Sequence, residues 1–405
     1  MTVQAGKTIY IYGNSTTITL PTVNTTLITN TTSNSATSGG NVTNDGVSPV
    51  TTRGICYATT ANPTTFNSIV SSGSGSGSFS SNLTGMLANT KYYLRAYATN
   101  NFGTAYGNQI NFTTGSGGNA GVWTQKNNFS VTLRTNPVSF SIGTKGYIGT
   151  GYDGSYKKDF WEWDQTTNVW TQKADFGGAA RGNAVGFSIG SKGYIGTGNQ
   201  GASYFNDFWE WDQTTNTWAQ KASCGGNVRS QAVGFSMGLN GYIGIGTANI
   251  TYLQDFWEWN QAANTWSQKA NFGGGQRGAC ASFTIGNKGY IGLGGSAGLF
   301  NDFWEWDQAT NAWTQKNNFP GTARIYAVGF SISNKGYVLS GTDFTNYYQD
   351  FWEWDQATNA WTQKANFSGA ARGFATGFSI GNKGYFGLGG KAGGIYMQDL
   401  WEYVP

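Results

Sequence analysis

The sequence predicts an all-β protein with at least two domains, because of its composition, a sharp change in that composition, and a regular repeat. Its 405 residues include 61 Gly, 25 Phe, 22 Tyr and 17 Trp, and such a composition favours strands and tight turns over helices. All the Trp residues lie at Trp123 or later, whereas residues 14–118 are rich in Thr, Ser, Asn and Gly. A chain of this length has room for two or three domains of about 100–200 residues each.

The first half is expected to hold an N-terminal segment, residues 1–21, followed by an antiparallel β-sandwich over residues 22–114. Short alternating segments separated by turn residues predict about seven strands there. One strand is expected at 51–59 and another at 91–99. In the second of these, alternation places four side chains on one face, namely Tyr92, Leu94, Ala96 and Ala98.

The segment from Leu83 to Ala98 resembles the penultimate strand of fibronectin type III domains. In that family a Leu five residues before a Tyr forms the tyrosine corner, and the matching residues here are Leu87 and Tyr92. The resemblance covers roughly residues 22–114. It implies a spacer or a binding module with no catalytic role.

A Gly- and Ser-rich linker, residues 115–121, separates this half from a repeat of about 48 residues. Asp-Phe-Trp-Glu-Trp or a close variant recurs at six positions, and Trp-x-Gln-Lys recurs six times in step with it. A third series is Arg followed by a strand of small residues and then a Gly-Tyr strand; its members are Arg134, Arg181, Arg229, Arg277, Arg324 and Arg372. Four short strands per period predict the blade of a β-propeller.

The order of the pieces predicts how the ring of blades closes. The repeat begins with a lone fourth strand at 122–126 and ends with a third strand at 399–403 that has no fourth. Pairing these two segments would complete six blades and remove two exposed sheet edges. Within each third strand, alternate residues such as Trp161 and Trp163 are expected to lie between neighbouring blades as core.

These motifs resemble the kelch repeat family over residues 122–405. The Arg, the Gly-Tyr-Ile-Gly strand, the two spaced Asp residues and the final Trp all match that family. Two features depart from it: the family's frequent His after the Arg is Ala184 or Cys280 here, and the double Gly appears only at 294–295 and 389–390. The resemblance implies a six-bladed propeller, and a fold does not by itself give a function.

The amino-acid composition excludes several classes of function. The chain contains no His, which excludes Ser-His-Asp and Cys-His catalysis and His-bound metals, including the copper site of some kelch oxidases. The net charge is +4 without a basic tract, so nucleic acid is not an expected partner. The three cysteines are scattered and are expected to be small buried residues, with no metal or other cofactor. The sequence shows neither a transmembrane helix nor a signal peptide, so either the protein is cytosolic or the chain is a mature or trimmed form.

Two interpretations of the six Arg residues stay open. An Asp begins the third strand of each blade at the same end, within reach of the Arg side chain across two strands. The two could therefore pair as scaffold, or the Arg residues could form a ring that binds an anionic ligand at the channel mouth.

The loops between second and third strands lie at that same end and differ from blade to blade. The polar residues specific to one loop are candidates for ligand contact: Asp153, Lys157, Lys158, Asn199, Gln200, Asn249, Asp343, Asn346 and Lys391. Ordinary solvated loop tips are the alternative interpretation.

We expect a secreted or cell-surface binding or adhesion protein of a bacterial type, a monomer that recognises a glycan or a protein through the loop face. Enzymatic activity is not expected, because no carboxylate pair specific to one blade stands ready for acid–base catalysis. A sugar-acid isomerase or mutarotase that uses the Arg ring, and a purely structural repeat protein, are the alternatives.

Overall fold

The computed structural model describes residues 19–32, 35–87, 90–114, 121–129, 132–391 and 393–405. Most of the predicted N-terminal segment 1–21 and of the linker 115–121 therefore lies outside the described residues. Contacts divide the chain into two compact units, residues 1–120 and residues 121–405. The described residues form strands and turns and no helix. None of them therefore belongs to a helix long and apolar enough to cross a membrane.

The first unit is made of two antiparallel sheets. One sheet has the order β1-β2-β5, and the other has the order β4-β3-β6-β7, with β8 also paired to β6. The strands are β1 (Thr22–Thr29), β2 (Ala36–Asn44), β3 (Thr52–Ala58), β4 (Ser68–Ser71), β5 (Gly77–Leu83), β6 (Lys91–Asn100), β7 (Gly103–Tyr106) and β8 (Ile110–Thr113). β7 and β8 pair with successive halves of β6.

The core of the first unit draws on both sheets. Leu94, Ala96 and Ala98 of β6 are fully buried and Tyr92 is nearly so, which is the face predicted from the alternation. The backbone N–H of Leu87 donates to the hydroxyl of Tyr92 at 3.1 Å. The two residues singled out by the sequence therefore meet.

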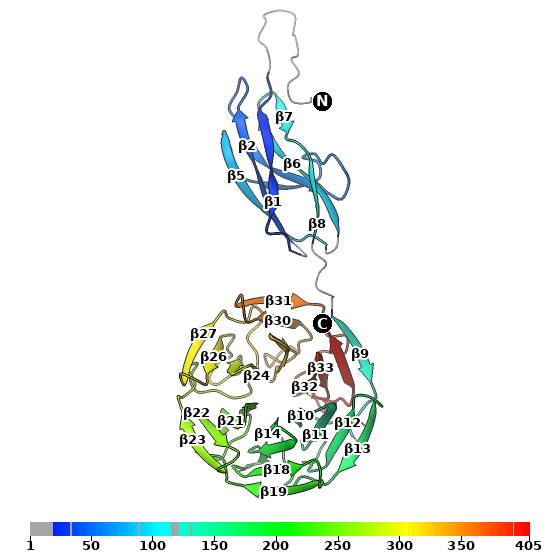
Figure 1. Ribbon diagram of the computed structural model, residues 1–405, viewed down its shortest axis with the longest axis vertical. Helices are drawn as coiled ribbons and strands as arrows, with labels where there is room; N and C mark the ends of the chain where they lie inside the picture. Colours follow the sequence, from blue (N-terminus) through cyan, green and yellow to red (C-terminus); the bar gives the residue numbers. More distant parts are fainter. Residues whose placement is uncertain (1–18, 33–34, 88–89, 115–120, 130–131, 392) are drawn as a thin grey trace, which may run out of the picture. The chain divides into compact units, whose positions relative to one another are not determined.

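The second unit contains six four-stranded antiparallel sheets within its described residues, arranged as a ring (Figure 1). Sheet 1 is β10 (Val138–Ile142), β11 (Lys145–Gly149), β12 (Phe160–Asp164) and β13 (Val169–Lys173). Sheet 2 is β14 (Val185–Ile189), β15 (Lys192–Gly196), β18 (Phe208–Asp212) and β19 (Thr217–Lys221). Sheet 3 is β20 (Val233–Met237), β21 (Asn240–Ala248), β22 (Thr251–Asn260) and β23 (Thr265–Lys269).

The remaining sheets continue the pattern. Sheet 4 is β24 (Ala281–Ile285), β25 (Lys288–Gly292), β26 (Phe303–Asp307) and β27 (Ala312–Lys316). Sheet 5 is β28 (Val328–Ile332), β29 (Lys335–Leu339), β30 (Phe351–Asp355) and β31 (Ala360–Lys364). Sheet 6 is β32 (Thr376–Ile380), β33 (Lys383–Gly387), β36 (Leu400–Val404) and β9 (Val122–Lys126). Two short hairpins, β16 (Asn199–Gln200) with β17 (Ser203–Tyr204) and β34 (Gly390–Lys391) with β35 (Ile395–Tyr396), lie in the loops.

The ring closes as the sequence predicted. β9 pairs antiparallel with β36, with Trp123 opposite Tyr403, so the first and last strands of the unit complete one sheet. The first strands β10, β14, β20, β24, β28 and β32 contact one another in sequence around the centre. The unit is therefore a closed, propeller-like ring, in which β9 covers the edge that β36 would otherwise expose.

Aromatic side chains fill the space between sheets. Trp163 is fully buried and lies 4.9 Å, between ring centroids, from Tyr385 of sheet 6. Trp161 is partly buried and packs against the cluster of buried residues that contains Trp163 and Tyr385. Both indoles thus project from one face of β12 into the gap between sheets, as expected, and burial of such large rings stabilises each interface by a few kcal/mol.

Candidate functional site

One end of each sheet is organised around the repeated Arg. The residue after each Arg forms a backbone bridge with the loop between the second and third strands, as in Thr135 with Tyr152 and Gly373 with Gly390. The loops and the segments that enter the first strands therefore form one continuous surface. We call this surface the loop face.

Each Arg is clamped by its own sheet. In sheet 1, Nη1 and Nη2 of Arg134 donate to the two carboxylate oxygens of Asp159, both at 2.8 Å. Nη1 also donates to the carbonyl of Thr150 at 3.0 Å. The ring of Phe129 lies 4.6 Å from the guanidinium carbon. The same bidentate geometry recurs in the pairs Arg181–Asp207, Arg229–Asp255, Arg277–Asp302, Arg324–Asp350 and Arg372–Asp399.

The six Arg residues do not form a ligand-facing ring. Each is at most 1% exposed, and the bidentate contact uses the donors that an anion would need. Burial raises the pKa of Asp255 and Asp399, but hydrogen bonds and charge from Arg229 and Arg372 outweigh it, so both pKa values lie below the ordinary value. Of the two interpretations of this series, the geometry supports internal pairing, and Arg134, Arg181, Arg229, Arg277, Arg324 and Arg372 are corrected from ligand contacts to scaffold.

A second set of six residues surrounds the centre of the loop face. It consists of the residue two positions after each Arg, and we call it the mouth ring: Asn136, Asn183, Gln231, Ala279, Tyr326 and Phe374. All six have positive φ, between 53° and 59°. This left-handed conformation costs residues other than Gly and Asn roughly 1–2 kcal/mol, so the structure holds Gln231, Ala279, Tyr326 and Phe374 in a strained backbone.

Backbone hydrogen bonds join the mouth ring from sheet to sheet. The N–H of Asn136 donates to the carbonyl of Phe374 at 2.9 Å, and the N–H of Asn183 donates to the carbonyl of Asn136 at 3.2 Å. The same contact joins Gln231 to Asn183, Ala279 to Gln231 and Tyr326 to Ala279. The backbone of the ring is therefore largely the same in every sheet, whereas the side chains differ.

The mouth ring divides into two arcs. Asn136, Asn183 and Gln231 come from consecutive sheets 1 to 3 and carry amides, whereas Tyr326 and Phe374 come from sheets 5 and 6 and carry aromatic rings, with centroids 4.1 Å apart. Ala279 separates the arcs on one side. The Gln231 amide donates to the Tyr326 hydroxyl at 2.5 Å.

Tyr326 is a neutral phenol at ordinary pH. Burial raises its pKa to about 12; the hydrogen bond from Gln231 opposes that rise, and the phenols of Tyr252 and Tyr204 add to it. The hydroxyl therefore keeps its proton and can donate a hydrogen bond while it accepts one from Gln231.

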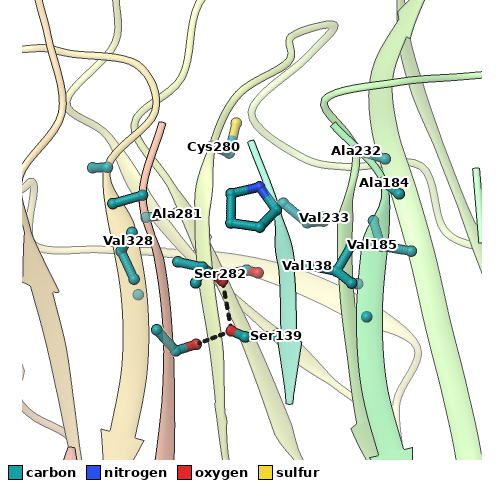
Figure 2. Close-up of a pocket in the computed structure, with 18 residues that line it drawn as sticks. Val138, Ser139, Ala184, Val185, Ala232, Val233, Cys280, Ala281, Ser282 and Val328 are labelled. Atoms are coloured by element: carbon teal, nitrogen blue, oxygen red, sulfur yellow. Dashed lines mark hydrogen bonds between the residues drawn. The ribbon is translucent and has the colours of Figure 1, made fainter. Parts of the chain in front are cut away.

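A central channel opens at the mouth ring. The space bounded by the ring and the small residues beneath it has a volume of about 140 Å³, and a further space of about 170 Å³ continues below. Figure 2 shows Cys280, Ala184 and Ala232 at one level and Ser139 and Ser282 deeper in the channel. The Ser139 hydroxyl donates to the carbonyl of Gly377 at 3.1 Å, which ties sheets 1 and 6.

Cys280 departs from the expectation for the cysteines. Cys56 and Cys224 are buried, but Cys280 is partly exposed and lines the channel. Although the residue is partly exposed, its thiol is largely shielded from water, and this burial raises the pKa of the Cys280 thiol to about 12. It is thus a neutral, weakly reactive thiol just below the mouth ring.

The loop residues chosen from the sequence fall into two groups. Five are held by their own loops: Asp153 pairs with Lys157 at 2.9 Å, Asn199 donates to the carbonyl of Gly201 at 2.9 Å, and Asp343 caps the turn that contains Asn346. For the other four, no hydrogen bond or ion pair with a described residue holds the side chain: Lys158, Gln200, Asn249 and Lys391. Only this second group is free for contact with a ligand.

The residues that line the channel do not form a metal or acid–base site. No group of three or more His, Cys, Asp or Glu residues that could hold a metal lies among the described residues. The side chains lining the mouth are amides, aromatic rings, small aliphatic groups and one thiol. Such a surface can hydrogen-bond and stack, but none of its groups has a pKa near neutrality.

Sequence reasoning missed the mouth ring. The signal was partial, because the residue two positions after each Arg varies among Asn, Gln, Ala, Tyr and Phe, but the residue before it varies as well. What the sequence did not show was that this residue faces the axis. The loops between second and third strands also vary, and the candidate ligand contacts were chosen from them instead.

Comparisons with known proteins give the fold. No family profile matches the chain, and no curated protein matches it. Among solved structures it is similar to one titled "Structure of YjhT". The TM-score is 0.61 at 16% identity, and the match covers 67% of this chain and 95% of that chain. At this identity the likeness supports the propeller-like arrangement of the second unit and carries no activity across.

Proposed function

We propose that this chain is a secreted or cell-surface binding protein that recognises a glycan or a protein through the loop face. In this proposal the second unit is a six-bladed propeller of the kelch type, and the first unit is a fibronectin type III-like sandwich that acts as a spacer or a second binding module.

The observation that carries the proposal is the contrast between scaffold and mouth. Arg–Asp clamps, aromatic packing and backbone geometry repeat in every sheet, whereas the mouth-ring position carries five residue types over the six sheets, namely Asn twice and Gln, Ala, Tyr and Phe once each. Repeated positions in a ring of similar sheets maintain the fold. Positions that differ on an unchanging and strained backbone favour a role in specificity.

The composition of the mouth favours binding over catalysis. A sugar-acid isomerase that used the Arg ring would need accessible guanidinium groups, and all six are occupied by Asp partners. Because the amide and aromatic groups around the channel hydrogen-bond and stack without transferring protons, they suit recognition.

The loop tips add exposed apolar area around the mouth. Ile250, Phe344 and Ile395 are 89%, 74% and 56% exposed at the tips of loops from sheets 3, 5 and 6. Apolar groups beside unpaired polar ones, such as Asn249 and Lys391, are typical of recognition surfaces.

The experiment is a steric block of one end of the propeller. Ile250 and Leu239 are both exposed, at 89% and 70%, and they lie in successive turns at opposite ends of sheet 3. The full chain carrying Cys280→Ala and either Ile250→Cys or Leu239→Cys is coupled to a polyethylene glycol maleimide. Each conjugate is screened against a glycan array and a displayed protein library.

The proposal expects ligands that bind the Leu239→Cys conjugate and fail to bind the Ile250→Cys conjugate. Binding blocked only at position 239 would contradict the loop face as the binding surface. A chain that binds nothing in either screen would contradict a binding function and favour a purely structural protein.

A further inference from the structure

The two arcs of the mouth ring offer two kinds of contact to one small ligand. The aromatic arc, Tyr326 and Phe374, presents an apolar surface. The amide arc, Asn136, Asn183 and Gln231, presents amide oxygens and the N–H groups not used by the bonds from Asn183 to Asn199 and from Gln231 to Tyr326. A sugar ring has the complementary pair of surfaces, because its C–H groups cluster on one face and its hydroxyls project from its edges.

The mouth is electrically neutral. Its lining residues include no Asp, Glu, Lys or Arg, and the nearby Arg guanidinium groups are buried and paired. A carboxylate or phosphate on the ligand would lose water without gaining a cation there. The site therefore favours an uncharged sugar over an acidic one.

The backbone of the mouth ring has few free N–H groups with which a peptide could form hydrogen bonds. A peptide that adds as a strand needs free N–H and C=O groups along an edge, and in the mouth ring five N–H groups already donate to neighbouring carbonyls. Recognition at the mouth thus depends on side chains. Amides can donate to and accept from neighbouring hydroxyls, which favours a sugar over a peptide as occupant.

The size of the opening limits what enters. The volume of about 140 Å³ lies below the roughly 300–1,000 Å³ of sites that enclose drug-sized ligands. One ring can occupy the mouth while the rest of the ligand extends over the loop face. This geometry suits the terminal residue of a glycan chain.

We infer that the mouth ring binds one uncharged sugar residue, with its apolar face against Tyr326 and Phe374 and its hydroxyls on the amides of Asn136, Asn183 and Gln231. The inference deepens the proposed function, on which it rests, by assigning the ligand class and the subsite.

The test uses the full chain and saturation-transfer NMR with methyl glycosides. The uncharged probes are the glycosides of glucose, galactose, mannose, fucose, rhamnose and N-acetylglucosamine, and the charged probes are those of glucuronic and galacturonic acid. We expect saturation of at least one uncharged probe, strongest at the C–H protons of one ring face, and none of the two acids.

Variants locate the site without disturbing the fold. Phe374→Asn removes half of the aromatic arc and introduces a residue that tolerates positive φ, so folding is retained. Phe344→Asn probes the loop tips, because Phe344 also has positive φ, 77°, and is exposed outside the mouth ring. Ser333→Asn is the matched control, because Ser333 also has positive φ, 55°, and is exposed in the turn between β28 and β29, at the opposite end of sheet 5. We expect Phe374→Asn to weaken binding about tenfold or more, a loss of about 1.4 kcal/mol or more, and Ser333→Asn to leave it unchanged.

Three outcomes would overturn the inference. Binding of only the uronic acids would refute the uncharged ligand class while leaving a binding function in place. Loss of sugar binding in Phe344→Asn but not in Phe374→Asn would move the site to the loop tips. If all probes fail while a displayed protein binds and depends on Phe374, the mouth is a protein site; if the protein screen fails as well, the proposed function fails with the inference.

Discussion

The side-chain amide of Gln231 donates to the hydroxyl of Tyr326 across the mouth of the channel, although the two residues belong to sheets 3 and 5. The intervening member of the ring is Ala279, whose side chain is a single methyl group. A hydrogen bond that skips one sheet couples the amide arc to the aromatic arc. Both arcs are therefore held in place before any ligand arrives.

This bond gives the first prediction. Tyr326→Phe removes the hydroxyl, keeps the aromatic wall, and should lower the free energy of unfolding by about 0.5–1.5 kcal/mol. Urea denaturation followed by Trp fluorescence measures the change. Gln231→Leu should have an effect of similar size, and the double variant should cost less than the sum of the two; strict additivity would show that the contact contributes nothing.

Ala279 gives a prediction with the opposite sign. Ala279→Gly removes a side chain from a position with φ of 56°, and relief of roughly 1–2 kcal/mol of backbone strain exceeds the entropy that Gly adds to the unfolded chain, about 0.4–1 kcal/mol. The melting temperature should stay equal or rise. Ala281→Gly, in the regular strand β24, should lower it, and a fall of equal size in both variants would contradict the strain at position 279.

The Arg–Asp clamp predicts an acid-sensitive fold. Because the pKa values of Asp255 and Asp399 are depressed in the folded state, their stabilisation is complete above the ordinary carboxyl pKa of about 4 and falls as the pH drops through the lower folded values. Denaturation between about pH 7 and pH 2.5 should show this loss.

Asp255→Asn should lower the free energy of unfolding by about 3–5 kcal/mol at neutral pH, because it leaves the buried Arg229 unpaired. It should also flatten the acid dependence. Asp164→Asn is the matched control, because Asp164 pairs with Lys145 near the surface, and its effect should be much smaller. Equal effects of the two variants would contradict the structural role assigned to the clamp.

The closing strand predicts a difference between equivalent Trp residues. Trp170 Nε1 donates to the carbonyl of Asn127 at 3.1 Å, whereas the buried Trp123 Nε1 has no partner among the described residues. Trp170→Phe should therefore cost about 1 kcal/mol more than Trp123→Phe. Unfolding free energies measured side by side give the difference, and a reversed order would show that the closing sheet is held in another way.

The channel thiol predicts how binding can be blocked. Because the pKa of Cys280 is about 12, methanethiosulfonate should modify it slowly at neutral pH and faster at alkaline pH. Cys56 and Cys224 are buried and should stay protected until unfolding. A modified Cys280 should obstruct the mouth and reduce ligand binding, whereas Cys280→Ala should bind normally and resist the reagent; equal inhibition of both would place the site elsewhere.

The repeat made much of this structure predictable. The spacing from Asp159 to Asp207 and onward predicted four strands per unit, and the incomplete first and last units predicted the pairing of Trp123 with the strand at Tyr403. Such features follow from hydrogen bonds and periodicity, which local sequence controls. The fate of Arg134 was left open, because sequence shows that an Asp is within reach but not which partner a guanidinium chooses.

The mouth ring lay beyond sequence reasoning for a physical reason. Left-handed backbone is expected at Gly or Asn, yet here Gln231, Tyr326 and Phe374 adopt it because inter-sheet hydrogen bonds impose it. Residues such as Asp153 attracted attention as specific and charged. Asp153 instead forms an ion pair with Lys157 of its own loop. That pairing depends on local turns that the sequence does not show.

The central claim is that specificity lies in the differences among the six mouth-ring residues. The most direct test is one variant that carries Gln231→Asn, Ala279→Asn, Tyr326→Asn and Phe374→Asn, so that every sheet presents Asn at this position. We expect the variant to fold, because Asn tolerates positive φ, with a stability lowered by loss of the Gln231–Tyr326 hydrogen bond, and we expect it to lose binding to the ligand that the wild-type chain selects. Undiminished binding by the folded variant would contradict the account.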